Sequence, residues 1–207
     1  MYVHYGCHFK APQEWRNFDA SWTLRWERLP LIGRTYTKNS MRFPPNVQVG
    51  DIVAGLPVPA ASCQGVYASH VLEHLCREDF HRALDNTRNI LREGGIFRLV
   101  VPDLEWAASE YIRNLRAGNY EANAVFLQAT LLGREKRVRG IRDLVYSWLR
   151  TSAHLWMWDG PSLAQALRDH GFRNVRQCQF GDCEDSMFAL VEEEGRFEHA
   201  AAVEARR

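Results

Sequence analysis

The clearest alternation of apolar runs and polar turns lies between residues 66 and 105. Val66–Ala68 is a short apolar run that predicts a strand. From Phe80 to Leu91 the apolar residues recur every three or four positions, which is the spacing of one face of an amphipathic helix. Ile96–Val101 is nearly all apolar, as in a strand that is covered on both faces. The pattern therefore predicts a strand–helix–strand unit.

Glycine, proline and polar residues follow the elements of this unit. We expect Gly94 and Gly95 to end the helix, because glycine adopts the left-handed conformation that terminates helices. Pro102 cannot continue a central strand, so the second strand should end there. Two strands joined by a helix form a right-handed parallel unit, and ligands bind at the carboxyl ends of such strands. The polar residues expected at these ends are Ser69, His70, Glu73, His74, Asp103 and Glu105.

The rest of the chain shows further strands and helices. Short apolar runs predict strands at Tyr2–Tyr5, Trp15–Asp19 and Val47–Val53, with a helix within Ser21–Leu29 and a loop over residues 33–45. Beyond the central unit, the pattern predicts helices over Leu104–Leu115, Tyr120–Leu132 and Ser162–His170, strands over Asn174–Phe180 and Ala200–Val203, and an acidic loop over Gly181–Glu194. Strands that alternate with helices indicate an α/β fold with a mostly parallel sheet.

Composition is typical of one globular domain spanning residues 1–207. Hydrophobic residues make up 46% of the chain and charged residues 25%, and the formal net charge of +1 gives no general attraction to nucleic acid or an anionic membrane. No stretch approaches the ~20 apolar residues of a membrane span, and no signal peptide is evident. The five cysteines are scattered without a C-x-x-C pair, as is typical of reduced thiols in the cytoplasm. We therefore expect a cytoplasmic protein that binds neither nucleic acid nor membrane.

One local run departs from this neutral background. Residues 134–142 carry five basic side chains against Glu135 alone. Such a run forms either a solvated helix or loop face, or a clamp for a phosphorylated or acidic acceptor, since arginine binds phosphate well. Both interpretations remain open at this stage.

His70-Val-Leu-Glu73-His74 matches the H-x-x-E-H pattern of one class of zinc peptidases. In such a site two histidines on one helical face hold zinc while the glutamate acts as base. Here His70 directly follows a predicted strand, and no glutamate lies between Glu135 and Glu184 to complete the ligand set. We therefore expect no metal site, with a zinc peptidase as a remote alternative. Glu73 should instead begin the next helix, and His74 is either structural or faces an acceptor.

Three stretches carry a resemblance to a known family: VYASHVLEHL at 66–75, LREGGIFRLVVPDLE at 91–105 and HLWMWDGPSLAQALRDHGF at 154–172. They resemble the class I S-adenosylmethionine-dependent methyltransferases, in particular the small methyltransferase type-11-like family. The resemblance implies a Rossmann-like sheet with helices on both faces, an abbreviated first helix and an antiparallel last strand. It also implies S-adenosylmethionine as cofactor and methyl transfer to a small-molecule or glycan acceptor. A homodimer is also open.

The ends of the first three predicted strands would hold the cofactor. Gly6 and Cys7 follow the first strand, where a glycine turn lets the backbone approach a ligand, although His8 replaces the second glycine of the family's usual Gly-Cys-Gly. Only twelve residues separate Gly6 from Asp19, so the first crossover is abbreviated. Asp19 ends the second strand and is the candidate ribose ligand, with a turn or helix-cap role as the alternative. The resemblance places Asp51 near the adenine; the alternative is a solvated aspartate at the strand edge.

The resemblance also places Ser69 and His70 at the methionine end of the cofactor. The candidate general bases are His70, Asp103 and His154, because each lies on a loop facing the predicted crevice. Methyl transfer from a sulfonium depends mainly on alignment, so the acceptor does not follow from the sequence. The rival function is a cofactor-poor binding or scaffold module, which His8 supports. A nicotinamide oxidoreductase is disfavoured because G-x-G-x-x-G is absent after the first strand.

Overall fold

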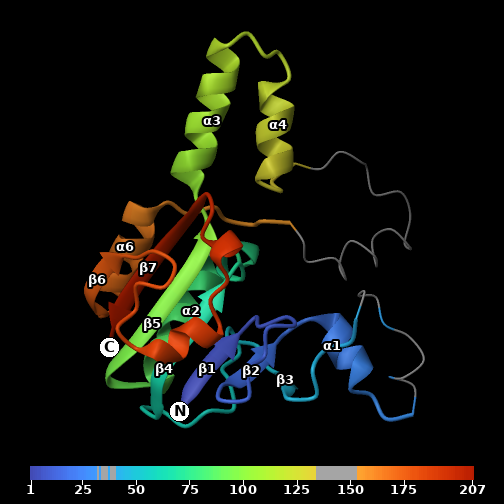
Figure 1. Cartoon of the computed structure of the whole chain (residues 1–207), viewed down its shortest axis with the longest axis vertical. Coiled ribbons are helices and arrows are strands. Elements are labelled where there is room, and N and C mark those ends of the chain that lie inside the picture. The colour runs from blue at the N-terminus through green and yellow to red at the C-terminus, as the bar shows by residue number, and fades with distance from the viewer. Residues whose placement is uncertain (32, 34–36, 38–40, 134–152) are drawn as a thin grey trace.

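A seven-stranded sheet forms the centre of the molecule (Figure 1). The computed structural model describes residues 1–31, 33, 37, 41–133 and 153–207. The strands are β1 (Tyr2–Tyr5), β2 (Arg16–Asp19), β3 (Val47–Val49), β4 (Cys63–Ser69), β5 (Leu91–Pro102), β6 (Arg173–Gln177) and β7 (Ala200–Arg206). Their order is β3-β2-β1-β4-β5-β7-β6, with β1 to β5 parallel and β7 antiparallel to both neighbours. The predicted mostly parallel sheet with an antiparallel last strand is confirmed.

Helices connect the strands and take up the predicted amphipathic segments. Within the described residues they are α1 (Trp22–Glu27), α2 (Arg77–Ile90), α3 (Leu104–Arg116), α4 (Ala122–Ala129) and α6 (Gly160–Asp169), with 3₁₀ turns η1 (Leu72–His74), η2 (Ser186–Leu190) and η3 (Glu194–Arg196). Local caps set several of their starts. The Ser21 hydroxyl accepts from the Leu24 N–H at α1, and Asp159 with Ser162 forms a capping box at α6.

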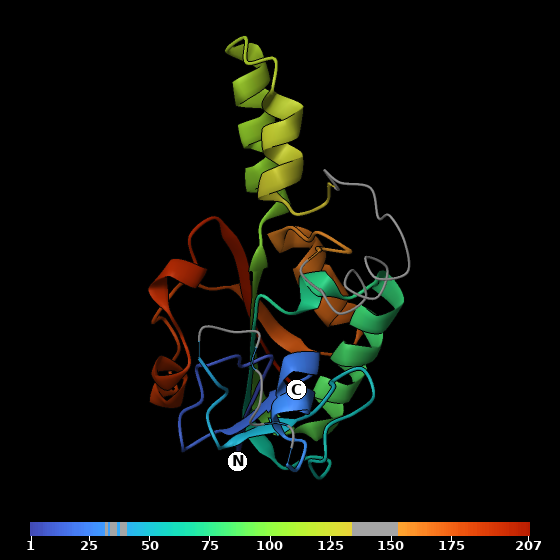
Figure 2. The same ribbon diagram turned by 90° about the vertical axis from the view of Figure 1, so that its right-hand side faces the viewer.

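Alternate residues of β5 face opposite sides of the sheet. Phe97, Leu99 and Val101 belong to the main hydrophobic core, to which α2 and α6 contribute their apolar faces. Ile96 and Val100 belong to a smaller core on the other side. Figure 2 shows α2 and α6 together on one side of the sheet. Burial on both sides explains why residues 96–101 are almost continuously apolar.

The second face is covered by the connection between β6 and β7, residues 178–199 (Figure 2). Phe188 of this connection packs against Trp15, with ring centroids 5.3 Å apart, and against Tyr67, with centroids 6.4 Å apart. Residues 6–15 between β1 and β2 form turns and no helix, as the short spacing predicted. The β6–β7 connection therefore covers the face that a helix after β1 would otherwise occupy.

Helices α3 and α4 form a hairpin that projects past the carboxyl ends of the parallel strands (Figure 1). The rings of Tyr111 and Phe126 pack between them with centroids 5.6 Å apart. The basic run at 134–142, which follows the hairpin in the chain, lies outside the described residues. Across the described parts of the chain, every helix is too short or too polar to cross a membrane.

Several predicted boundaries are wrong by a few residues. Helix α2 ends at Ile90 rather than at Gly94, because β5 already begins at Leu91, which pairs with Cys63 of β4. The register of β4 against β5 then shifts between Cys63 and Gly65. Gly94 and Gly95 therefore lie in this irregular part of the sheet and not at the end of a helix. Strands β3 and β6 are also shorter than predicted and end at Val49 and Gln177.

Candidate functional site

A tight turn follows β1 at the edge where the parallel strands end. Gly6 has φ +65°, and a Cβ atom at this position would lie 2.1 Å from Cγ2 of Val71, so only glycine fits. His8 also has a positive φ of 47°, and its N–H donates to Oδ2 of Asp19 at 3.1 Å. Cys7 between them is buried, and this burial raises the pKa of its thiol. The predicted glycine turn is therefore present, with Val71 packed directly on its backbone.

Asp19 and Asp51 lie at the ends of the next two strands. Asp19 is 7% exposed, and its Oδ1 accepts from the N–H of Ser21 at 2.8 Å while Oδ2 holds the turn after β1. Asp51 accepts from the N–H of Val53 at 2.9 Å just after β3. Both carboxylates thus have the turn role that was the alternative for Asp19. Their binding of ribose and adenine stays a prediction.

Ser69 and His70 lie at the carboxyl end of β4. The Ser69 hydroxyl oxygen is buried and has no hydrogen-bond partner among the described residues. His70 has φ +53°, and its Nε2 lies 2.9 Å from the carbonyl oxygen of Arg196. Burial lowers the pKa of His70. The β6–β7 connection therefore contacts the predicted cofactor residues through Arg196, whose Nη1 also donates to the Ser69 carbonyl at 3.4 Å.

Glu73 lies in η1, not at the start of α2 as predicted, because that helix begins four residues later at Arg77. Its side chain is buried, and neither carboxylate oxygen has a hydrogen-bond partner among the described residues. Burial raises the pKa of Glu73 to about 8. Three imidazoles surround its Oε1: Nδ1 of His70 at 3.7 Å, Nε2 of His74 at 3.9 Å and Nε2 of His154 at 4.0 Å. The predicted bases His70 and His154 therefore meet around a glutamate that was not predicted as functional.

The crevice between the β1 turn and the β6–β7 connection is narrow. A cavity of about 10 Å³ lies there, lined by His4, Gly6, Cys7, Lys10, Tyr67, Ser69, Val191, Glu193 and Arg196. A nucleoside cofactor needs a pocket of about 300–1,000 Å³. The orphaned Ser69 hydroxyl and the carboxylate of Asp19 suit the polar ends of S-adenosylmethionine, so the residues fit its chemistry. Binding at this crevice requires the wall formed by residues 191–196 to move away from Gly6.

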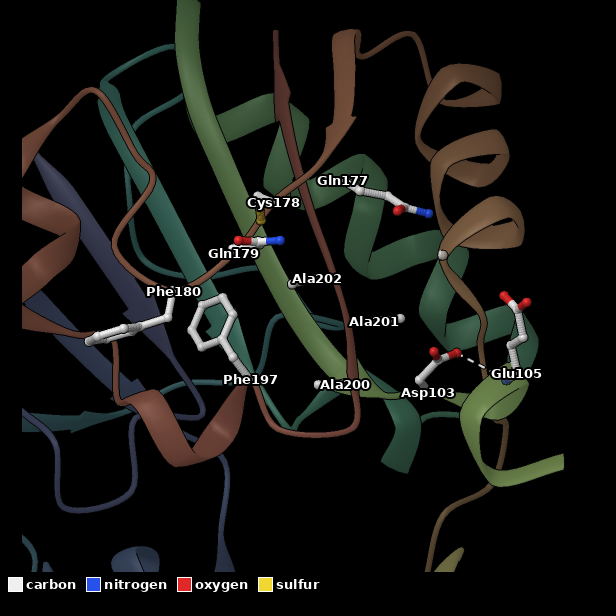
Figure 3. A pocket seen from close by; sticks show the side chains of 11 residues that line it. Asp103, Glu105, Gln177, Cys178, Gln179, Phe180, Phe197, Ala200, Ala201 and Ala202 are labelled. Atoms are coloured by element: carbon white, nitrogen blue, oxygen red, sulfur yellow. Dashed lines mark hydrogen bonds between the residues drawn. The ribbon is translucent and has the colours of Figure 1, made fainter. Parts of the chain in front are cut away.

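Asp103 lies in a different part of the same edge. Its side chain accepts from the Glu105 N–H at 3.0 Å and caps α3. It also lines a cavity of about 490 Å³ (Figure 3). The labelled residues around this cavity are Asp103, Glu105, Gln177, Cys178, Gln179, Phe180, Phe197 and Ala200–Ala202. Of the three candidate bases, Asp103 is the one found in the described lining of this cavity, and its role as a base stays a prediction.

A buried arginine holds the β6–β7 connection onto the sheet. The Arg98 guanidinium is fully buried, and it donates to Glu192 at 2.7 Å and to Glu204 at 2.6 Å. It also donates to Asp182 at 2.9 Å. The sequence analysis missed this cluster, although a lone arginine within an apolar strand was its signal. Through Glu192, this cluster holds residues 191–196, which form one wall of the crevice, against the sheet.

The fold and the polar edge together define a class I methyltransferase architecture. A sequence model described as a methyltransferase domain matches residues 12–177. The chain therefore belongs to the methyltransferase domain family and is an S-adenosylmethionine-dependent methyltransferase. This excludes the zinc peptidase and favours an enzyme over the scaffold module.

Solved structures share the fold at low sequence identity. An S-adenosylmethionine-dependent methyltransferase from Archaeoglobus fulgidus is 14% identical with a TM-score of 0.50, and the match covers 100% of this chain and 85% of that one. PigF with S-adenosylhomocysteine is 13% identical with a TM-score of 0.51, and the match covers 100% of this chain and 50% of that one. Among curated proteins, no sequence matches the chain.

Proposed function

We propose that the enzyme methylates a small-molecule or glycan acceptor that binds in the cavity beside Asp103. The observation that carries the proposal is the lining of this cavity of about 490 Å³. Its carboxylates and amides come from Asp103, Glu105, Gln177 and Gln179, and its phenyl rings come from Phe180 and Phe197. Hydrogen-bonding groups beside aromatic faces suit a polar ring compound, and the volume is within the range of about 300–1,000 Å³ for small-molecule sites.

The position of the cavity supports this acceptor role. Ser69 pairs with Val100 in the sheet, so Asp103 lies just beyond the same edge as the end of β4. Phe197 lines the cavity, and its chain neighbour Arg196 lines the crevice at Gly6. One short segment therefore separates the acceptor cavity from the cofactor crevice.

The reaction is an in-line displacement. An acceptor hydroxyl oxygen or amine nitrogen forms a bond to the methyl carbon as the carbon–sulfur bond breaks. The electron pair of that bond goes to sulfur, leaving S-adenosylhomocysteine, and the acceptor proton goes to a base or to water. Alignment alone can supply about 7–11 kcal/mol of the barrier. Asp103 is the candidate base that lines the acceptor cavity, whereas His154 lies beside Glu73.

The test uses S-adenosylmethionine with a labelled methyl group and a panel of free sugars, glycosides and small hydroxyl or amine compounds. We expect S-adenosylhomocysteine release and a methylated product with a subset of this panel. Asp103→Asn should keep the α3 cap, since Asn caps as well as Asp, but lower turnover about 100-fold as loss of a general base does. Tyr120→Ala, at the far end of the α3–α4 hairpin, is the matched control.

Two results would contradict the proposal separately. Binding of S-adenosylhomocysteine without turnover of any acceptor in the panel would refute the acceptor class. Unchanged turnover in Asp103→Asn would refute the assignment of this carboxylate as the base.

A further inference from the structure

Glu73, His74 and His154 bring their donor atoms together although they come from distant parts of the chain. One ligand atom from each lies within 4.8 Å of the other two. Glu73 and His74 belong to η1, whereas His154 precedes α6 by several residues. The Glu73 side chain is 1% exposed and that of His154 is 7% exposed, so the cluster is largely shielded from water.

The hydrogen bonds of the histidines fix where their lone pairs point. Nδ1 of His74 lies 3.0 Å from the carbonyl oxygen of Ala153. A carbonyl oxygen only accepts, so this nitrogen carries the proton and Nε2 of the neutral ring presents a lone pair toward Glu73. The same argument applies to His70, whose Nε2 donates to Arg196 and whose Nδ1 faces Glu73. A backbone carbonyl that orients an imidazole in this way is typical of metal-binding histidines.

Neither hydrogen bonds to the imidazoles nor protonation satisfies the buried carboxylate of Glu73. The distances of 3.7–4.0 Å from Oε1 to the three imidazole nitrogens exceed the hydrogen-bond range of about 2.7–3.2 Å. A protonated Glu73 would still lack a hydrogen-bond partner for either oxygen among the described residues. The lone pairs of His70 and His74 therefore face the same buried carboxylate oxygen, at 3.7 and 3.9 Å.

We propose that Glu73, His74 and His154 bind one divalent transition-metal ion. A tetrahedral ion with ligands at about 2.1 Å holds donor atoms about 3.4 Å apart. The separations of 3.9 and 4.0 Å from Oε1 of Glu73 to Nε2 of His74 and of His154 exceed this value by about half an ångström. Imidazole with a carboxylate suits zinc, iron, cobalt or manganese.

This site differs from the peptidase site that the H-x-x-E-H pattern suggested. Glu73 is a ligand here rather than a base, and a ligand comes from His154 far along the chain. The residues of η1 form one 3₁₀ turn, not the helical face that a peptidase uses.

The proposed metal site follows the end of β4 closely in the chain, because η1 begins three residues after Ser69. Ser69 itself lines the cofactor crevice, whereas none of the three proposed ligands lines the acceptor cavity at Asp103. An ion there would hold η1 and the segment before α6 together, which is a structural use that does not depend on the identity of the acceptor.

The test begins with the full chain treated with EDTA and transferred to chelator-free buffer. Titration with zinc and with cobalt should each show one equivalent bound with micromolar or tighter affinity, and cobalt should develop visible absorption bands. Glu73→Gln and His154→Gln should each weaken binding at least 100-fold. His81→Gln is the matched control, because Nδ1 of His81 in α2 bonds to Nε2 of His170 and His81 is not part of the cluster, so the change should leave binding unchanged.

Thermal melting shows whether each variant folds, so loss of metal binding can be told from loss of structure. Glu73→Gln replaces a buried carboxyl group that has no hydrogen-bond partner among the described residues with a neutral side chain of similar size. The variant should therefore melt near the temperature of the metal-free wild type, and zinc should no longer raise that temperature. The proposed site would be overturned if the wild type bound no stoichiometric metal ion. It would also be overturned if Glu73→Gln and His154→Gln bound the metal ion as tightly as the wild type. S-adenosylhomocysteine binding by the EDTA-treated protein, measured separately, tests the methyltransferase function without the ion.

Discussion

Replacing Arg98 by methionine should destabilise the enzyme by about 3 kcal/mol. The change removes the guanidinium from between Glu192 and Glu204, two carboxylates that are themselves buried. Breaking a buried pair by removing one partner costs about 3–5 kcal/mol, because the remaining charge is left uncompensated. We expect the lower end of this range. Glu204 keeps its bond from Arg176 at 3.1 Å, and Glu192 keeps the Gly181 N–H at 2.9 Å.

The expected loss translates into a clear change in melting temperature. For a domain of 150–250 residues each kcal/mol corresponds to about 2–4 °C, so Arg98→Met should melt about 6–12 °C lower. Urea unfolding followed by tryptophan fluorescence measures the free energy directly. Arg82→Met is the control, since Arg82 pairs with Glu78 on the exposed side of α2 and such pairs contribute only about 0–1 kcal/mol. A loss below about 1 kcal/mol for Arg98→Met would refute the inference that this arginine compensates buried charge.

Two further predictions concern the cofactor and acid stability. Asp19→Ala should weaken S-adenosylhomocysteine binding about tenfold or more in calorimetric titration, by losing a charge-assisted hydrogen bond; unchanged affinity would show that Asp19 only organises the turn. Burial alone would raise the pKa of Asp182, but hydrogen bonds from Arg176 and Arg98 lower it to about 2. Its stabilising contribution is therefore complete above the unfolded pKa of about 3.9 and is lost as pH falls toward 2. Urea titrations between pH 2 and 6 should show this decline, and an equally steep decline in Asp182→Asn would contradict it.

The elements that the hydrophobic pattern predicts best are those with local signals. Helix α6 carries its own cap at Asp159 and its own apolar face, and the strand at Ile96–Val101 is marked by composition alone. Neighbouring residues decide such elements, so their existence follows from the sequence. Their ends depend on partners elsewhere, and α2 ends early because Leu91 pairs with Cys63 of a different strand.

The candidate site was predictable where it depends on strand ends and unpredictable where it depends on long-range contacts. Strand ends placed Gly6, Asp19 and Ser69 at one edge of the sheet, as the structure shows. His154 approaches Glu73 from a distant part of the chain, and the spacing of H-x-x-E-H does not predict this third imidazole. Asp103 was predicted, like the histidines, to face the cofactor crevice; in the structure it caps α3 and lines a second cavity, which the order of residues in the sequence does not reveal.

The placement of β7 has a consequence for how the enzyme is made. This strand comes last among the seven in the sequence, yet it lies between β5 and β6 in the sheet. The two glutamates that hold Arg98 and the segment that walls the crevice also come late, within residues 191–204. A ribosome releases these residues after the parallel half of the sheet, so the nascent chain carries an unpaired arginine and an uncovered β5 edge until then. Such an edge is a template for aggregation, so β5 of the growing chain is exposed to it until β7 is inserted.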